Sequence, residues 1–121
     1  MRTRAVTAGL LLSGAFALGG CGALCRADTQ EERGAPGGRY SVSVETVDCV
    51  GTSRAKRVVM HNLDGMFKDS AAVAIYDDSD PDDPTEVTVH WELDRKLIIH
   101  GHGARVWSFQ PYWHGVQIEQ R

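Results

Sequence analysis

The pattern of hydrophobic and polar positions divides the chain into three parts. Residues 5–18 carry no charge and form the only long apolar run, whereas residues 22–38 have almost nothing to bury. From residue 39 onward, short runs alternate apolar with polar residues, a period of two that is typical of half-buried strands. The strand candidates are 40–45, 56–63, 71–76, 87–93, 97–99, 105–110 and 116–119. The pattern predicts a mainly β domain over residues 39–121, a small antiparallel sandwich or barrel of six to seven short strands.

Two stretches leave the local structure open. The alternation of the first strand shifts near Thr46, because Val47 and Cys49 lie on the opposite parity, and this predicts a bulge or a strand end. Residues 71–76 fit a helix as well as a strand, because six residues are too few to fix the period.

The clearest strand signal lies at residues 87–93, followed by Asp94-Arg95-Lys96 and a second apolar run. A three-residue loop would pair Leu93 with Leu97 and Trp91 with Ile99, and so match apolar residues across a hairpin. A two-residue loop would instead bring Lys96 and His100 onto the face of Leu93 and Trp91. We therefore expect the three-residue loop.

The apolar run ends in Leu18-Gly19-Gly20-Cys21, and Arg2 and Arg4 precede it. It is shorter than the roughly 20 residues of a spanning helix and has the length of a signal-peptide core. A large aliphatic residue, two small residues and a cysteine resemble the lipobox of bacterial lipoproteins. This predicts a signal peptide over residues 1–20 and acylation of Cys21, with membrane attachment through chains such as palmitate. The alternative is an ordinary secretory peptide or an anchor followed by a cysteine.

Polar composition predicts a flexible tether over residues 21–38, including the lipidated cysteine. Without the signal peptide, 11 basic and 16 acidic residues remain, a formal charge of −5. Because the sequence has no basic cluster, it argues against nucleic acid as a partner.

The chain has three cysteines. If Cys21 carries lipid, Cys25 and Cys49 form an even pair that an oxidising compartment tends to join in a disulfide. The alternative is that Cys49 is a small buried residue and Cys25 an incidental thiol.

Three histidines share a predicted sheet face. The expected hairpin places His90 opposite His100, with His102 two positions further on the same face. Neighbouring imidazoles suit Zn²⁺ or Cu²⁺, so these three residues are metal-site candidates. Solvent-exposed polar residues are the simpler interpretation, and no cofactor is expected.

The stretch Asp77–Pro84 carries the alternating carboxylates of Asp78, Asp80 and Asp82, but has neither the glycine nor the final glutamate of a calcium loop. We expect a solvated acidic loop. The sequence has no recognisable catalytic motif, so an enzyme is not expected.

The globular part resembles a family of small uncharacterised bacterial lipoproteins. The residues that carry this resemblance are Gly38-Arg39-Tyr40, Asp48-Cys49, Val87–Trp91 with Leu97 and Ile99, and Gly115-Val116-Gln117-Ile118. Val50–Ser53 stands where that family has a Gly-Ala-Thr-Thr-like stretch. The resemblance implies a lipoprotein with a β-rich domain and no assigned reaction.

Two functional hypotheses follow. The first is a membrane-anchored interaction module of the cell envelope that binds an envelope protein, and the second is a lipoprotein that binds a small ligand or metal on its histidine face. The residue after Cys21 is Gly22, not the aspartate of an inner-membrane retention signal. We therefore expect the periplasmic side of the outer membrane in a cell with two membranes, and otherwise the outer face of the cell membrane.

Overall fold

A computed structural model describes residues 24–50, 54–64, 69–102 and 105–121. These residues form nine strands and no helix. The strands are β1 (Cys25–Gly34), β2 (Tyr40–Cys49), β3 (Ala55–Asn62), β4 (Asp69–Asp77), β5 (Glu86–Leu93), β6 (Lys96–His102), β7 (Val106–Phe109), β8 (Tyr112–Trp113) and β9 (Val116–Gln120). The segment 71–76, which left helix open, lies inside β4.

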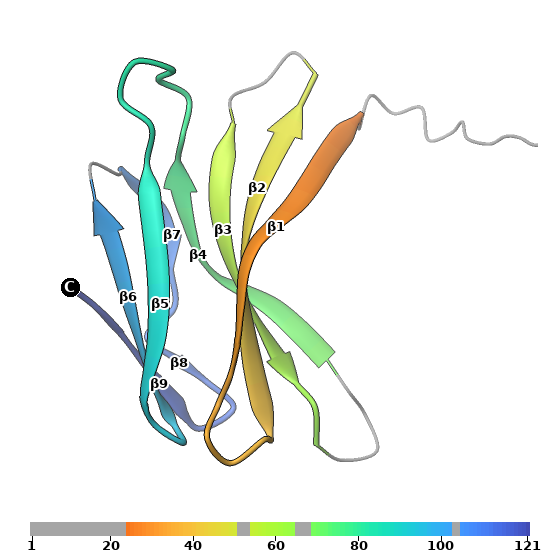
Figure 1. Ribbon diagram of the computed structural model, residues 1–121, viewed down its shortest axis with the longest axis vertical. Coiled ribbons are helices and arrows are strands. Elements are labelled where there is room, and N and C mark those ends of the chain that lie inside the picture. Colours follow the sequence, from red (N-terminus) through yellow and green to blue (C-terminus); the bar gives the residue numbers. More distant parts are fainter. Residues whose placement is uncertain (1–23, 51–53, 65–68, 103–104) are drawn as a thin grey trace, which may run out of the picture.

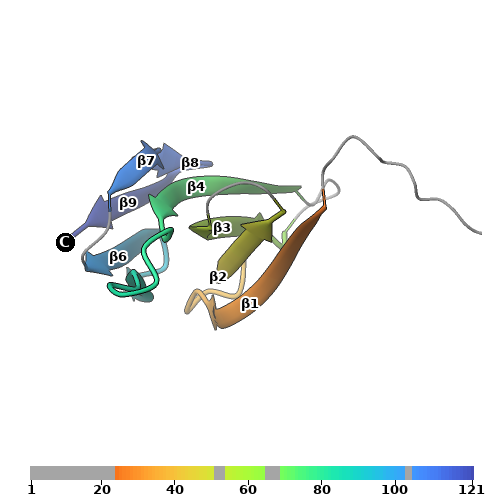
Figure 2. The ribbon, with the colours of Figure 1, turned by 90° about the horizontal axis from the view of Figure 1, so that it is seen from above.

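The strands form two sheets that pack face to face as a β-sandwich (Figures 1 and 2). The larger sheet has the order β1-β2-β3-β4-β7, and the smaller has the order β5-β6-β9-β8. Of the predicted sandwich or barrel, the structure has the sandwich, with nine strands in the described residues instead of the expected six to seven.

One pair departs from the predicted antiparallel arrangement, because β6 and β9 run parallel. The chain leaves the smaller sheet after β6, adds β7 to β4 in the larger sheet, and then returns as β8 and β9. Such a crossover is what a parallel pair requires, whereas a tight hairpin joins antiparallel strands.

The core lies between the inner faces of the two sheets. Alternate residues of β2 and β3, such as Val42, Val44, Val58 and Met60, are almost completely buried. The smaller sheet contributes Val87, Val89, Leu97, Ile99, Val116 and Ile118. The period of two therefore correctly predicted the core-facing residues Tyr40, Val42 and Val44 of β2, Val87 and Val89 of β5, and Leu97 and Ile99 of β6.

Strand β1 corrects the expected flexible tether over residues 21–38, of which residues 24–38 are described. Ten residues pair antiparallel with β2, from Cys25 opposite Cys49 to Gly34 opposite Ser41, with a bulge at Gln30. β1 is an edge strand whose residues are mostly exposed, so its polar sequence needs no apolar face. Backbone pairing can therefore hold a segment that has little to bury.

The bulge or strand end expected near Thr46 is not in β2, which pairs with β3 without interruption from Tyr40 to Val47. The bulge of this region lies on β1, at Gln30 opposite Val44 and Glu45. The inner face of β2 becomes polar at this end, with Thr46 half-buried and Asp48 exposed. Figure 1 shows β1 and β2 leaning away from the smaller sheet toward this end. Where the sheets separate, the inner face no longer needs apolar residues, so the sequence parity changes although the strand continues.

The β5–β6 hairpin differs from the expected three-residue loop. Asp94 and Arg95 form a two-residue turn, Leu93 pairs with Lys96, and Trp91 pairs with Leu97. Glu92 is the extra residue of a bulge on β5. Because of the extra residue, Val89 pairs with Ile99 on the core face although the turn has only two residues. Leu93, which was expected to be buried, is exposed at the tip of the hairpin.

Candidate functional site

The two cysteines of the described chain meet at one corner of the sandwich. Cys25 and Cys49 lie opposite each other on β1 and β2, with 3.9 Å between the Cα atoms and 2.05 Å between the sulfurs. Leu24 and Val50 flank the disulfide and are 68% and 73% exposed. We call Leu24, Cys25, Cys49 and Val50 the disulfide corner. A shallow depression of about 400 Å³ lies there, next to Arg26. The predicted lipid site, Cys21, lies outside the described residues.

The histidine face is on the outer side of the smaller sheet. His90 and His100 lie diagonally, because His100 pairs with Thr88 and His90 with Ile98. Their rings are nevertheless stacked, with centroids 5.3 Å apart and planes 20° apart. His102 lies opposite Glu86, further along β6. No group of three metal-ligating side chains is present among the residues that the structure describes. Of the three predicted ligands, the structure brings together His90 and His100 but not His102.

Four charged residues lie on the same outer face and form an ion network. Lys96 Nζ is 3.3 Å from Glu92 and 3.5 Å from Glu119, while Arg121 is 3.0 Å from Glu92 and 2.7 Å from Glu119. The hydrogen bond from Lys96 lowers the pKa of Glu92, and the hydrogen bond from Arg121 lowers the pKa of Glu119. The network therefore keeps both carboxylates ionised and joins the tip of the hairpin to the C-terminal strand.

The larger sheet carries a hydrogen-bonded histidine, His61, that the sequence pattern did not indicate. His61 Nε2 is 3.0 Å from the Ser43 hydroxyl, and its Nδ1 is 2.7 Å from the Ser70 hydroxyl. Ser43 is buried and lies on β2, while Ser70 is exposed and lies on β4. Both ring nitrogens are occupied by hydroxyls, so no carboxylate orients this imidazole as in a catalytic triad. Only the strand register brings the three residues together, and single-sequence patterns do not reveal it.

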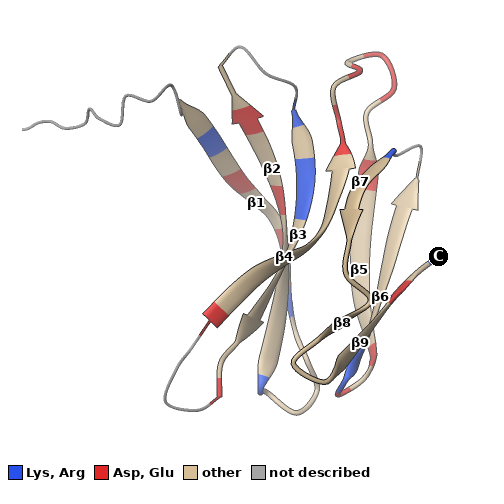
Figure 3. Cartoon of the chain, turned by 180° about the vertical axis from the view of Figure 1, so that it is seen from behind, with Lys and Arg blue, Asp and Glu red and all other residues tan. Residues whose placement is uncertain are grey.

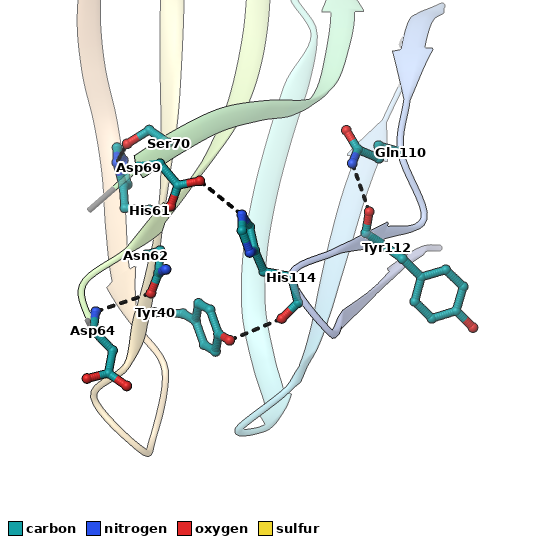
Figure 4. Close-up of polar contacts among 9 residues, drawn as sticks. All are labelled: Tyr40, His61, Asn62, Asp64, Asp69, Ser70, Gln110, Tyr112 and His114. Carbon is teal, nitrogen blue, oxygen red and sulfur yellow. Dashed lines mark hydrogen bonds and ion pairs between the residues drawn. The ribbon is translucent and has the colours of Figure 1, made fainter. Parts of the chain in front are cut away.

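A second histidine joins the two sheets at the end shown in Figure 4. His114 Nε2 lies 2.9 Å from Asp69 Oδ2 on β4, and the Tyr40 hydroxyl donates to the His114 carbonyl over 3.1 Å. His114 and Gly115 both have positive φ, as the tight turn between β8 and β9 requires. These contacts hold the β8–β9 turn against β2 and β4 and leave Tyr112 pointing outward (Figure 4).

Exposed aromatic residues lie on the edge strands β7 and β8. Trp107 is 47% and Tyr112 63% exposed, and Val106 beside Trp107 is 38% exposed. Trp113, by contrast, packs in the core against Tyr40. Tryptophan and tyrosine are enriched in protein interfaces, so these edge strands expose the types of side chain that such interfaces use.

Figure 3 shows the acidic residues of the loop between β4 and β5 in red. Most of this loop is exposed, as expected of a solvated acidic loop, but Asp78 is not. Asp78 is buried, where it pairs with Arg54 at 3.2 Å and accepts a hydrogen bond from the Thr85 amide. Asp80 accepts from the Asp82 amide. These carboxylates organise their own loop instead of converging on a cation.

A cleft of about 500 Å³ lies between the edge strands β1 and β5. Its lining has charges of both signs, from Glu31, Arg33, Lys56 and Glu86. The Trp91 indole donates to the Arg33 carbonyl over 3.0 Å and so ties the two edges together. This mixed lining selects no single class of ligand.

Comparisons with protein-family models, with curated proteins and with solved structures find no match for this chain. Among the described residues, no helix has the length and apolar character to cross a bilayer.

Proposed function

We propose that this protein is a lipid-anchored component of the bacterial cell envelope whose β-sandwich serves as a non-enzymatic interaction module. The observation that carries the proposal is the use of the cysteines. A sulfur forms one disulfide, so the bond between Cys25 and Cys49 leaves Cys21 as the third cysteine of the chain. That residue is the one that ends the lipobox-like Leu18–Cys21 sequence, where acylation needs a free thiol.

The disulfide also supports an exported location. Disulfides persist in oxidising compartments and are rare in the bacterial cytosol. The signal-like residues 1–20 and the disulfide are independent features that favour the same side of the membrane. The protein then stands on the periplasmic side of the outer membrane, or on the outer face of the cell membrane where there is only one.

Mass spectrometry of the mature N-terminus tests the anchor. We expect Cys21 at the N-terminus with its acyl chains, and we expect Cys21→Ser to abolish retention in the membrane fraction. A soluble product cleaved elsewhere, with an unmodified Cys21, contradicts the proposal.

The edge formed by β7 and β8 supports the interaction role, since Trp107 and Tyr112 combine large contact area with exposure. A photo-crosslinking residue at Tyr112 should give one adduct of constant mass in intact cells. Leu93 is the matched control, because it is 64% exposed but lies at a hairpin tip. The adduct should be lost in the Trp107→Ala variant. Equal labelling at both positions contradicts a specific partner at this edge.

The stacked pair His90 and His100 favours a second candidate function, the binding of Zn²⁺ or Cu²⁺. Small rotations of the two rings would let one nitrogen of each meet on a single ion. Titration of the purified protein should show that His90→Ala and His100→Ala each weaken binding about tenfold or more, about 1.4 kcal/mol. The His102→Ala variant is the control for a two-histidine site. Unchanged affinity in the double variant of His90 and His100 would exclude it.

A further inference from the structure

The distance between the proposed lipid and the folded domain is short. β1 begins at Cys25, so only three residues separate it from Cys21. Four Cα–Cα steps span at most about 14 Å when fully extended. The expected tether of residues 22–38 would have allowed about 55–60 Å. The disulfide fixes the beginning of β1 to the end of β2, so this end of the domain stays near the lipid.

The same end presents the two most exposed large hydrophobic residues of the described chain, Leu24 and Val50. The Val50 amide donates to the Leu24 carbonyl over 3.0 Å, so both residues belong to one corner. Arg26 beside them has a side chain that is 82% exposed, and its ion pair with Asp28 is long at 3.6 Å. Apolar side chains next to an extended cation suit the boundary between acyl chains and lipid headgroups.

We infer that the disulfide corner rests on the membrane that holds the lipid anchor, with Leu24 and Val50 inserted at the headgroup boundary and Arg26 among the headgroups. This inference rests on the proposed acylation of Cys21. The occupant of the corner is the bilayer itself, because a lipid within about 14 Å leaves little room for anything else between the corner and the membrane.

The charge distribution sets the tilt of the domain. The loop after β4 carries exposed Asp80, Asp82 and Asp83 at the same end of the sandwich (Figures 1 and 3). β1 and β4 are three strand spacings apart in the sheet, about 14 Å. Anionic headgroups repel this loop. The domain therefore leans on the β1–β2 corner and keeps the acidic loop in water.

Paramagnetic broadening of amide signals tests this orientation. The full mature lipoprotein is placed in nanodiscs of phosphatidylcholine and phosphatidylglycerol that contain a headgroup-nitroxide lipid. We expect loss of the amide signals of Leu24, Arg26 and Val50. The signals of Gly37 and Asp94 should persist, because their hydrogen-bonded turns lie at the far end of β1, about 30 Å away.

The double variant Leu24→Ser/Val50→Ser separates insertion from mere proximity. It should reduce the broadening of the Arg26 signal, although the short connection keeps the corner near the bilayer, while Leu93→Ser, which changes a similarly exposed leucine at the far end, should not. Unchanged shifts of the core amides show that both variants are folded.

Mass spectrometry of the same samples distinguishes the two proposals. An unmodified Cys21 overturns the proposed anchor and this inference with it. An acylated Cys21 with even broadening over the domain, with broadening strongest at Gly37, or with no response to the double variant overturns the docking of the corner alone.

Discussion

At the scale of single residues, Tyr76 is the most unusual member of the core. Its side chain is completely buried, and its hydroxyl has no hydrogen-bond partner among the described residues. Burial raises the pKa of Tyr76 to about 12. An unsatisfied buried hydroxyl costs about 1–3 kcal/mol, so Tyr76→Phe should increase the free energy of unfolding, by about 1 kcal/mol.

Urea denaturation measures this increase, and pH gives a second readout. Because the folded state favours the neutral hydroxyl, the ionisation of Tyr76 leaves the free energy of unfolding unchanged below the unfolded pKa of about 10. As pH rises from there toward about 12, the unfolded state ionises first and the free energy of unfolding falls. Tyr76→Phe should therefore lose less stability than the wild type across that range. A destabilised variant would mean that the hydroxyl has a partner.

Gly101 on β6 is the residue against which the Tyr76 ring packs. A Cβ atom at this position would lie 2.8 Å from Tyr76 Cε1, closer than carbon atoms approach. We expect Gly101→Ala to destabilise the protein by about 1–3 kcal/mol through overpacking. Gly34→Ala is the control, since no atom lies within 4 Å of its Cβ position and the change should be nearly neutral. Equal denaturation midpoints for the two variants contradict this packing argument.

At the scale of elements, two strands show what the sequence could and could not predict. The alternation of β5 and β6 predicted a hairpin, and Val87 and Val89 are buried as expected. The bulge at Glu92 could not be predicted from the alternation of apolar residues. A two-residue turn with a bulge places Trp91 opposite Leu97, and a three-residue loop without one places it opposite Ile99, so the sequence pattern fits either arrangement. β1 gave no signal at all, since an edge strand paired through its backbone needs no apolar residue.

The ion network is the product of that bulge, because Glu92 reaches Lys96 and Arg121 on the outer face. Both glutamates have a lowered pKa in the folded state. Their contribution to stability is therefore present above the unfolded glutamate pKa, about 4.3, and is lost as pH falls through the lower folded values. Thermal melts at falling pH should show a smaller loss for Glu92→Gln/Glu119→Gln than for the wild type. Added salt should weaken the difference, because the pairs are exposed.

At the scale of the whole molecule, local patterns predicted the sandwich but not its connections. Two sheets follow from several half-buried strands that need a common core. The parallel pair β6–β9 depends on a crossover through β7 in the other sheet. The histidine contacts between Asp69 and His114 likewise depend on how the sheets meet. Such long-range pairings leave no periodicity in the sequence, so they required the structure.

The disulfide determines how the polar edge strand is held to the rest of the molecule. Cys25 and Cys49 are 24 residues apart, and closing such a loop stabilises the folded state by up to about 3.5 kcal/mol in the chain-entropy model. In the Cys25→Ser/Cys49→Ser variant we expect a loss of unfolding free energy up to that size. Because β1 is an edge strand and mostly exposed, the loss should begin there as local opening.

Hydrogen exchange distinguishes local opening from general destabilisation. Amides of β1 that pair with β2 should exchange much faster in the double variant, while amides of β6, in the middle of the smaller sheet, should stay protected. Reduction of the Cys21→Ser protein is the matched control, because it opens the same bond without altering either residue. If β1 stays protected after the bond is opened, its backbone pairing alone holds the strand. The short connection from Cys21 to the sandwich would then not depend on the disulfide.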